Sequence, residues 1–126
     1  MSLRTPIGRA RGLGSAKEGT HHWWHERLTA IALIPLCIWF AISLVWLAGA
    51  SYAEVVAWLA EPVPAAMMLL LIGFGLYHLK LGMQVVIEDY VSTEWMKLAG
   101  IIVVSFWCLA LGLACAMAVL HIWLGA

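Results

Sequence analysis

Charged residues are scarce in this sequence of 126 residues. Only 11% of the residues are charged, whereas 64% are hydrophobic, and the mean hydropathy is +0.95. Soluble domains carry about 25% charged residues, so a chain this poor in charge is expected in a lipid bilayer. The formal net charge is zero. Because this provides no basic field for a nucleic acid, no nucleic-acid partner is expected.

Cysteine is also sparse, which limits the metal centres that the chain can build alone. The three cysteines are Cys37, Cys108 and Cys115, and no two form a CxxC pair, so neither an iron–sulfur nor a zinc framework is predicted. A cleavable signal peptide is not predicted either. Residues 1–19 hold four Lys or Arg among Gly and Ser, and the apolar run that follows is too long for a signal-peptide core.

Long apolar windows are what the sequence has in abundance, at about 28–48, 63–88 and 97–124. Roughly 20 apolar residues cross a bilayer as a helix. Only helices or closed barrels satisfy the backbone in lipid, and three segments are too few for a barrel. We therefore predict an all-α membrane protein with three transmembrane helices. We expect residues 1–126 to form a single transmembrane domain, with a cytoplasmic or interfacial segment at 1–26 and a short interfacial helix near 52–60.

The basic residues predict the orientation of these helices. Five Lys or Arg precede residue 28, and two more lie at 80 and 97, whereas residues 49–64 and the C-terminus hold none. The positive-inside rule then places the N-terminus and the 88–97 loop in the cytoplasm. The 49–64 loop and the C-terminus are predicted on the outer, periplasmic side.

His78 lies inside the second window, where an ionisable group is costly and usually functional. A neutral histidine bonded to a neighbouring helix is the alternative. Gly75 and Gly82 stand at i−3 and i+4 on the same helix face. They would leave room for a flat porphyrin with the imidazole as its axial iron ligand, or they could serve close helix packing.

A haem held by two histidines needs a second one at the same depth. His121 is the other candidate within the apolar windows, but it lies near the outer end of the third window. The two histidines would differ in depth by roughly 20 Å at 1.5 Å per residue. If His78 binds haem through a histidine pair, the second ligand must therefore come from another chain.

Two groups near the predicted inner interface could also carry chemistry. Asp89 and Tyr90 close the second window. A tyrosine hydroxyl backed by a carboxylate can hydrogen-bond a quinone carbonyl and relay protons, although an interfacial aromatic belt has the same pattern. Arg27 begins the first window and could bind a carboxylate such as a haem propionate, or could act only as a basic anchor.

The string His78-Leu79-Lys80-Leu81-Gly82-Met83-Gln84-Val85-Val86-Ile87-Glu88-Asp89-Tyr90-Val91 resembles the pattern H-x3-G-x6-D-Y of the smaller membrane-anchor subunit of succinate dehydrogenase, respiratory complex II. Residues 27–33, Arg-Leu-Thr-Ala-Ile-Ala-Leu, also resemble the start of that subunit's first helix. Chain length, helix number and orientation agree with this family. The larger anchor subunit is a poorer match, because its His-Arg-x-Ser/Thr-Gly motif is missing.

The resemblance implies a role for each candidate residue. His78 would be one axial ligand of haem b, with Gly75 and Gly82 on the haem-facing surface and the other ligand on the larger cytochrome b anchor subunit. Tyr90 would hydrogen-bond ubiquinone near the iron–sulfur subunit, with Asp89 adjacent. Arg27 and His21 would lie near the haem propionates. The family assigns no role to Lys80.

The resemblance also implies what the whole assembly does. The chain would be a non-flavin anchor of succinate:ubiquinone oxidoreductase in the bacterial inner membrane. Succinate would be oxidised on the flavoprotein subunit, and this chain would hold no succinate-oxidising site. The alternatives are an anchor of a related fumarate reductase or cytochrome b complex, or a small membrane scaffold or transporter without a cofactor.

Overall fold

The computed structural model describes residue 7 and residues 19–125. Its helices are α2 (Gly19–Trp46), α3 (Tyr52–Leu59), α4 (Pro62–Tyr90) and α5 (Glu94–Leu124), and the described residues contain no strand. The helices α2, α4 and α5 are long and apolar enough to cross a membrane. The predicted all-α fold with three transmembrane helices is confirmed. Most of the predicted cytoplasmic segment lies outside the described residues.

The helices begin and end at different residues from those expected. The first was expected from 28, yet α2 begins at Gly19. Hydropathy windows miss the polar and aromatic residues 20–27, whereas helical hydrogen bonding does not depend on apolar side chains. In α4, Pro62 occupies the first turn, where its missing N–H costs little. This helix continues without a break to Tyr90, so all the candidate residues of the second window share one helix.

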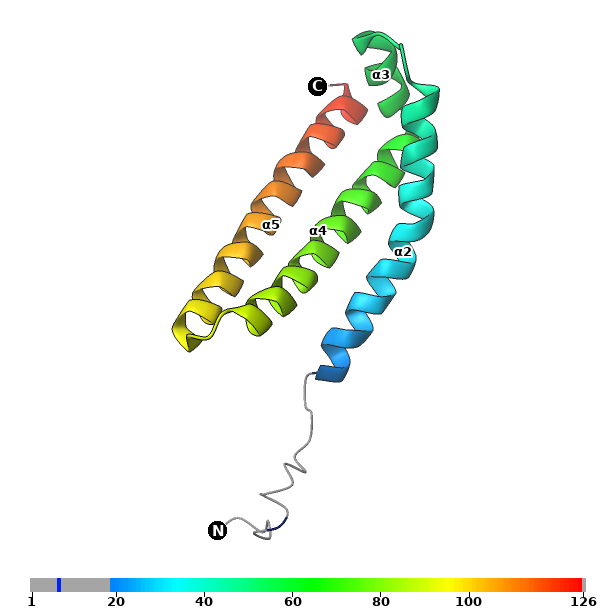
Figure 1. Cartoon of the computed structure of the whole chain (residues 1–126). Helices are drawn as coiled ribbons and strands as arrows, with labels where there is room; N and C mark the ends of the chain where they lie inside the picture. The colour runs from blue at the N-terminus through cyan, green and yellow to red at the C-terminus, as the bar shows by residue number, and fades with distance from the viewer. Residues whose placement is uncertain (1–6, 8–18, 126) are drawn as a thin grey trace.

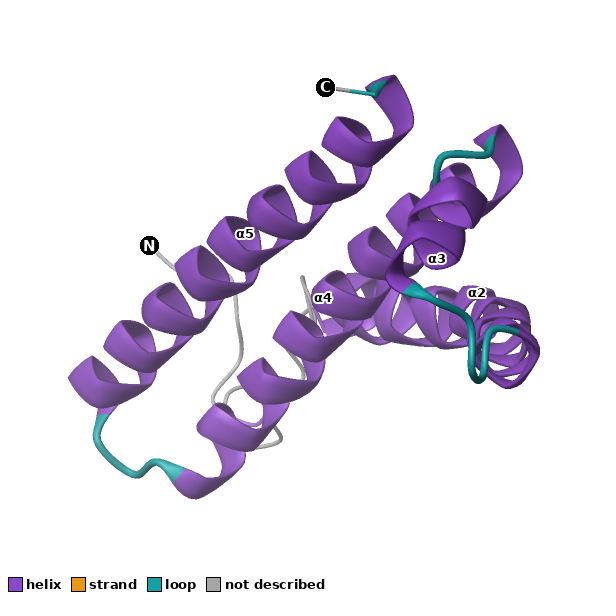
Figure 2. Ribbon diagram, turned by 90° about the horizontal axis from the view of Figure 1, so that it is seen from above, coloured by secondary structure: helices purple, strands orange, loops and turns teal. Residues whose placement is uncertain are grey.

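The helix α4 is the centre of the arrangement (Figure 1). It packs against α2 on one side and against α5 on the other, while α2 and α5 make no contact with each other among the described residues. Seen from above, α4 and α5 lie side by side and α2 lies on the far side of α4 (Figure 2). The result is an open layer of helices with broad uncovered faces.

Small residues bring α4 and α5 close together. A Cβ built on Gly112 would lie 3.3 Å from Leu76, and one built on Gly100 would lie 3.4 Å from Ile87. Glycine at such crossings lets helices approach closely in lipid. Burial is otherwise slight, since the only apolar side chains buried among the described residues are those of Leu36, Ala65, Leu81 and Val119.

The two ends of the layer carry different segments. The start of α2 and the α4–α5 loop lie at one end, whereas α3 and the end of α5 lie at the other (Figure 1). The basic residues predict the same arrangement, with the N-terminus and the α4–α5 loop on one side of the membrane and the α3 segment and the C-terminus on the other. The assignment of the first end to the cytoplasm stays a prediction.

The short helix α3 is held at its start by a reciprocal cap. The Ser51 backbone N–H donates to Glu54 Oε2 at 2.7 Å, and the Glu54 backbone N–H donates to Ser51 Oγ at 3.4 Å. These bonds satisfy N–H groups that a helix start leaves unpaired. At the end of α3, Trp58 stacks on Trp39 of α2, with the ring centroids 5.9 Å apart. The short helix is therefore capped at its start and packed against α2 near its end.

The cap makes the start of α3 sensitive to acid. The hydrogen bonds from the Ser51 hydroxyl and backbone hold the pKa of Glu54 below its ordinary value of 4.5. A depressed carboxyl pKa stabilises the folded state above 4.5, and this contribution is lost as the pH falls through the folded pKa. We expect Ser51→Ala to raise the pKa of Glu54 toward 4.5 and Ser51→Thr to leave it low, as measured by carboxyl ¹³C NMR titration. A Glu54 titration unchanged by Ser51→Ala would contradict this.

Candidate functional site

His78 lies in the middle of α4, where this helix crosses α2. Its Nδ1 atom is 2.9 Å from the Oγ1 atom of Thr29, a residue of α2 that is only 4% exposed. The bond joins two positions 49 residues apart in the chain. The imidazole is therefore hydrogen-bonded to a buried hydroxyl of the neighbouring helix through only one of its two nitrogens.

The surroundings of Thr29 determine which imidazole nitrogen carries the hydrogen. The Thr29 hydroxyl lies 2.8 Å from the carbonyl oxygen of His25 and 3.0 Å from that of Glu26. A hydroxyl has one hydrogen and two lone pairs, and both carbonyls can only accept. The hydroxyl therefore donates to the backbone of α2 and accepts from His78 Nδ1–H, and in the neutral imidazole this tautomer leaves the lone pair on Nε2.

The Nε2 atom of His78 has no hydrogen-bond partner among the described residues, and it is not among their buried unpaired polar atoms. A neutral imidazole whose other nitrogen is held by a hydrogen bond is the usual form of a metal-binding histidine. The alternative prediction, a histidine bonded to a neighbouring helix, describes Nδ1 but leaves Nε2 without a role.

The glycines beside His78 face open space. A Cβ built on Gly75 or Gly82 would meet nothing within 4 Å. They differ in this from Gly100 and Gly112, which lie against side chains of α4. Close packing within this chain therefore does not account for Gly75 and Gly82. They leave a bare strip of helix surface above and below the imidazole.

Asp89 and Tyr90 form a second candidate site at the end of α4. Both are exposed, and Tyr90 is 85% exposed. Along the helix axis Tyr90 lies about 18 Å from His78 at 1.5 Å per residue. The structure therefore keeps the two candidate sites on one helix and at different depths, and it leaves the tyrosine hydroxyl accessible at the end that also holds the start of α2 (Figure 1).

Arg27 and His21 lie on α2 and make no hydrogen bond to His78 among the described residues. The Arg27 guanidinium carbon is 5.5 Å from the ring centroid of Trp23 on the same helix, and both side chains are exposed. Arg27 stands two positions before Thr29, so it points to nearly the opposite side of α2. Arg27 is therefore available to a group outside this chain.

His21 lines an open polar groove of about 650 Å³ between the start of α2 and α4. The Nε2 atom of His22, which also lines it, is buried without a hydrogen-bond partner among the described residues. Nearby, the Tyr77 hydroxyl is 3.1 Å from His25 Nδ1. The groove thus offers several imidazoles to a polar group, although no three His, Cys, Asp or Glu side chains of the described residues gather as metal ligands.

Lys80 has a hydrogen-bond partner on its own helix. Lys80 Nζ donates to Gln84 Oε1 at 3.1 Å, and Gln84 Nε2 donates to Glu88 Oε1 at 2.8 Å. All three stand four residues apart on α4, a spacing that favours such bonds. All three line the polar groove between the start of α2 and α4.

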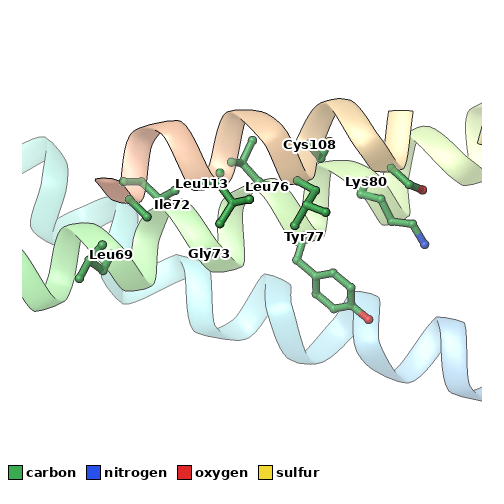
Figure 3. A pocket seen from close by; sticks show the side chains of 12 residues that line it. Leu69, Ile72, Gly73, Leu76, Tyr77, Lys80, Cys108 and Leu113 are labelled. Carbon is green, nitrogen blue, oxygen red and sulfur yellow. The ribbon is translucent and has the colours of Figure 1, made fainter. Parts of the chain in front are cut away.

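Another hollow of the described chain is an apolar groove of about 420 Å³ between α4 and α5. Figure 3 shows Leu76, Cys108 and Leu113 beside it, with Tyr77 pointing away toward α2. Apart from Tyr77, Lys80, Ser105 and Cys108, its lining is apolar. His121 is exposed near the far end of α5, as expected for a residue that does not meet His78.

Thr29 is the site residue that sequence reasoning missed. It is a hydroxyl within an apolar run, and buried polar side chains are nearly always hydrogen-bonded. That rule predicts a partner for Thr29 but does not identify it.

Comparison with known proteins gives one consistent result. The family model described as "Succinate dehydrogenase/Fumarate reductase transmembrane subunit" matches residues 1–112. The chain is 36% identical to the succinate dehydrogenase hydrophobic membrane anchor subunit of Rickettsia bellii over 120 residues, 94% of this chain and 95% of the relative. It is also 36% identical to the subunit of the same name from Paracoccus denitrificans over 106 residues, 84% and 82% of the two chains. No solved structure matches it significantly.

Proposed function

We propose, given that this chain belongs to the family of succinate dehydrogenase hydrophobic membrane anchor subunits, that it supplies one axial ligand of a haem b and part of a ubiquinone-reduction site. Membership makes the chain a multi-pass protein of the bacterial inner membrane that associates with the other subunits of complex II. The proposal concerns what its own residues do there.

The observation that carries the haem proposal is the hydrogen bonding of the two imidazole nitrogens of His78. Its Nδ1 is hydrogen-bonded to Thr29, and its Nε2 has no partner among the described residues. The open strip at Gly75 and Gly82 fits a flat macrocycle beside that nitrogen. These residues therefore suit an axial ligand, and a bound haem b would supply a one-electron redox centre within the membrane. The other axial ligand is proposed on the larger cytochrome b anchor subunit.

Arg27 and His21 are proposed to lie near the haem propionates. The exposed guanidinium of Arg27 is a strong hydrogen-bond donor to carboxylates, and His21 lines the polar groove at the same end of α2. Their proposed role is to bind the propionate carboxylates and thereby hold the haem in place.

The ubiquinone proposal rests on the end of α4. The Tyr90 hydroxyl is exposed and can donate a hydrogen bond to a quinone carbonyl, while the adjacent Asp89 can pass a proton to or from water. A site there lies at the predicted cytoplasmic interface, within reach of an iron–sulfur subunit. Succinate oxidation is proposed on the flavoprotein subunit, which receives no residue from this chain.

The test is a spectrum of the intact assembly. We expect this chain, tagged and isolated in mild detergent, to bring a flavoprotein with it and to give a b-type haem band in the dithionite-reduced minus oxidised spectrum. An assembly that contains flavin but lacks the haem band would refute the haem proposal. A colourless preparation without a flavoprotein would instead support a cofactor-free scaffold or transporter.

A further inference from the structure

Thr29 is one of only two polar side chains that are buried among the described residues; the other is Ser43, also on α2. Both hydroxyls bond back to a carbonyl four residues earlier, Thr29 to His25 and Ser43 to Trp39, each at 2.8 Å. Such bonds are common for hydroxyl residues within helices. Only the Thr29 hydroxyl reaches a side chain of another helix, and that side chain is His78.

The bonds around Thr29 form a chain from the α2 backbone to the imidazole. The hydroxyl donates to the backbone, which fixes the direction of its lone pairs, and one lone pair accepts from His78 Nδ1–H at 2.9 Å. An imidazole on a single helix could otherwise turn about its terminal torsion, which is broad. The bond to Thr29 selects both the tautomer and the ring orientation.

We propose that Thr29 is a positioning residue, which holds the imidazole of His78 with Nδ1 protonated and Nε2 directed at the haem iron. This inference rests on the proposed ligation by His78. A histidine ligand that donates its second N–H to an acceptor is oriented and made more basic. Greater basicity favours ferric over ferrous iron, so the Thr29 bond lowers the reduction potential of the haem.

The experiment replaces Thr29 with residues that separate its hydroxyl from its shape. Valine keeps the branched shape and lacks the hydroxyl, whereas serine keeps the hydroxyl and lacks the methyl group. In the isolated complex we expect Thr29→Val to shift the ferric–ferrous balance toward ferrous iron about tenfold, which raises the midpoint potential by about 59 mV for one electron. The ferric low-spin electron paramagnetic resonance signal should broaden as the ring orientation relaxes.

Matched variants determine how the result is interpreted. Thr29→Ser should keep the wild-type potential and signal, and Ser43→Ala, which removes the other buried hydroxyl of α2, should keep both. A wild-type potential in Thr29→Val, or an equal shift in Thr29→Ser, would overturn the inference, because shape rather than the hydroxyl would then matter. Thr29→Ala serves the same purpose if the valine variant does not assemble.

The inference and the proposed function fail in different ways. If His78 does not bind haem, His78→Ala keeps the wild-type haem spectrum, and none of the Thr29 variants changes it. If His78 binds haem without help from Thr29, His78→Ala loses the band while Thr29→Val keeps the wild-type potential.

Discussion

The substitution His78→Ala is expected to remove most of the haem from the isolated complex. Loss of an axial ligand should lower the haem-to-flavin ratio on the order of tenfold or more, since even substitutions of residues that only support a ligand cost 10–100-fold in metal affinity. Any haem that stays would lack one strong ligand and become high-spin. The measurement is the reduced minus oxidised spectrum, normalised to flavin and compared with the ferric spin state.

The structure indicates that this variant should still fold. The Thr29 hydroxyl keeps its bonds to the carbonyls of His25 and Glu26 when the imidazole is removed, so no buried donor is left unpaired. His121→Ala provides the matched control, because His121 lies exposed near the far end of α5. A full haem content in His78→Ala, with the complex intact, would exclude axial ligation by this residue.

The open strip at Gly75 and Gly82 gives a second test of the same haem proposal. Gly82→Val adds a branched side chain to the open strip beside His78, whereas Gly73→Val adds the same side chain to the apolar groove on another side of α4. Both positions are free of neighbours within this chain, so both variants should fold alike. Haem loss in the Gly82 variant alone would support a macrocycle on that face.

The fold was predictable from the sequence because it depends mainly on the length of the apolar runs. Three such runs in a chain with few charges leave helices as the only way to satisfy the backbone in lipid. The boundaries were less predictable. The helix α2 starts at Gly19 and not at 28, since a helix that leaves the bilayer keeps its hydrogen bonds after its side chains become polar.

The candidate site was predictable only where it depends on one helix. The spacing of Gly75, His78 and Gly82 needs nothing more than helical periodicity. The bond between His78 and Thr29 needs the register of two helices 49 residues apart in the chain, and no local pattern contains that register. The polar row from Lys80 through Gln84 to Glu88 follows helical spacing and could have been predicted.

The substitution Tyr90→Phe is expected to lower ubiquinone reduction while the complex stays assembled. Tyr90 is 85% exposed and closes α4, so loss of its hydroxyl should leave the fold unchanged. Removal of a positioned proton donor typically costs 10²–10⁴-fold, and we expect a loss on the order of 100-fold in succinate-driven ubiquinone reduction. Succinate oxidation with an artificial acceptor should stay at the wild-type rate, because the proposed succinate site lies on the flavoprotein subunit and receives no residue from this chain.

The chain offers a matched control for this prediction in Tyr52, which is 84% exposed at the start of α3. Tyr52→Phe makes the same chemical change at the opposite end of the helix layer and should leave ubiquinone reduction unchanged. Asp89→Asn should lower the rate in the same direction as Tyr90→Phe if the carboxylate exchanges protons with water. Wild-type ubiquinone kinetics in Tyr90→Phe would mean that its hydroxyl does not act on the quinone and that the tyrosine is an interfacial aromatic residue, whatever the state of the haem.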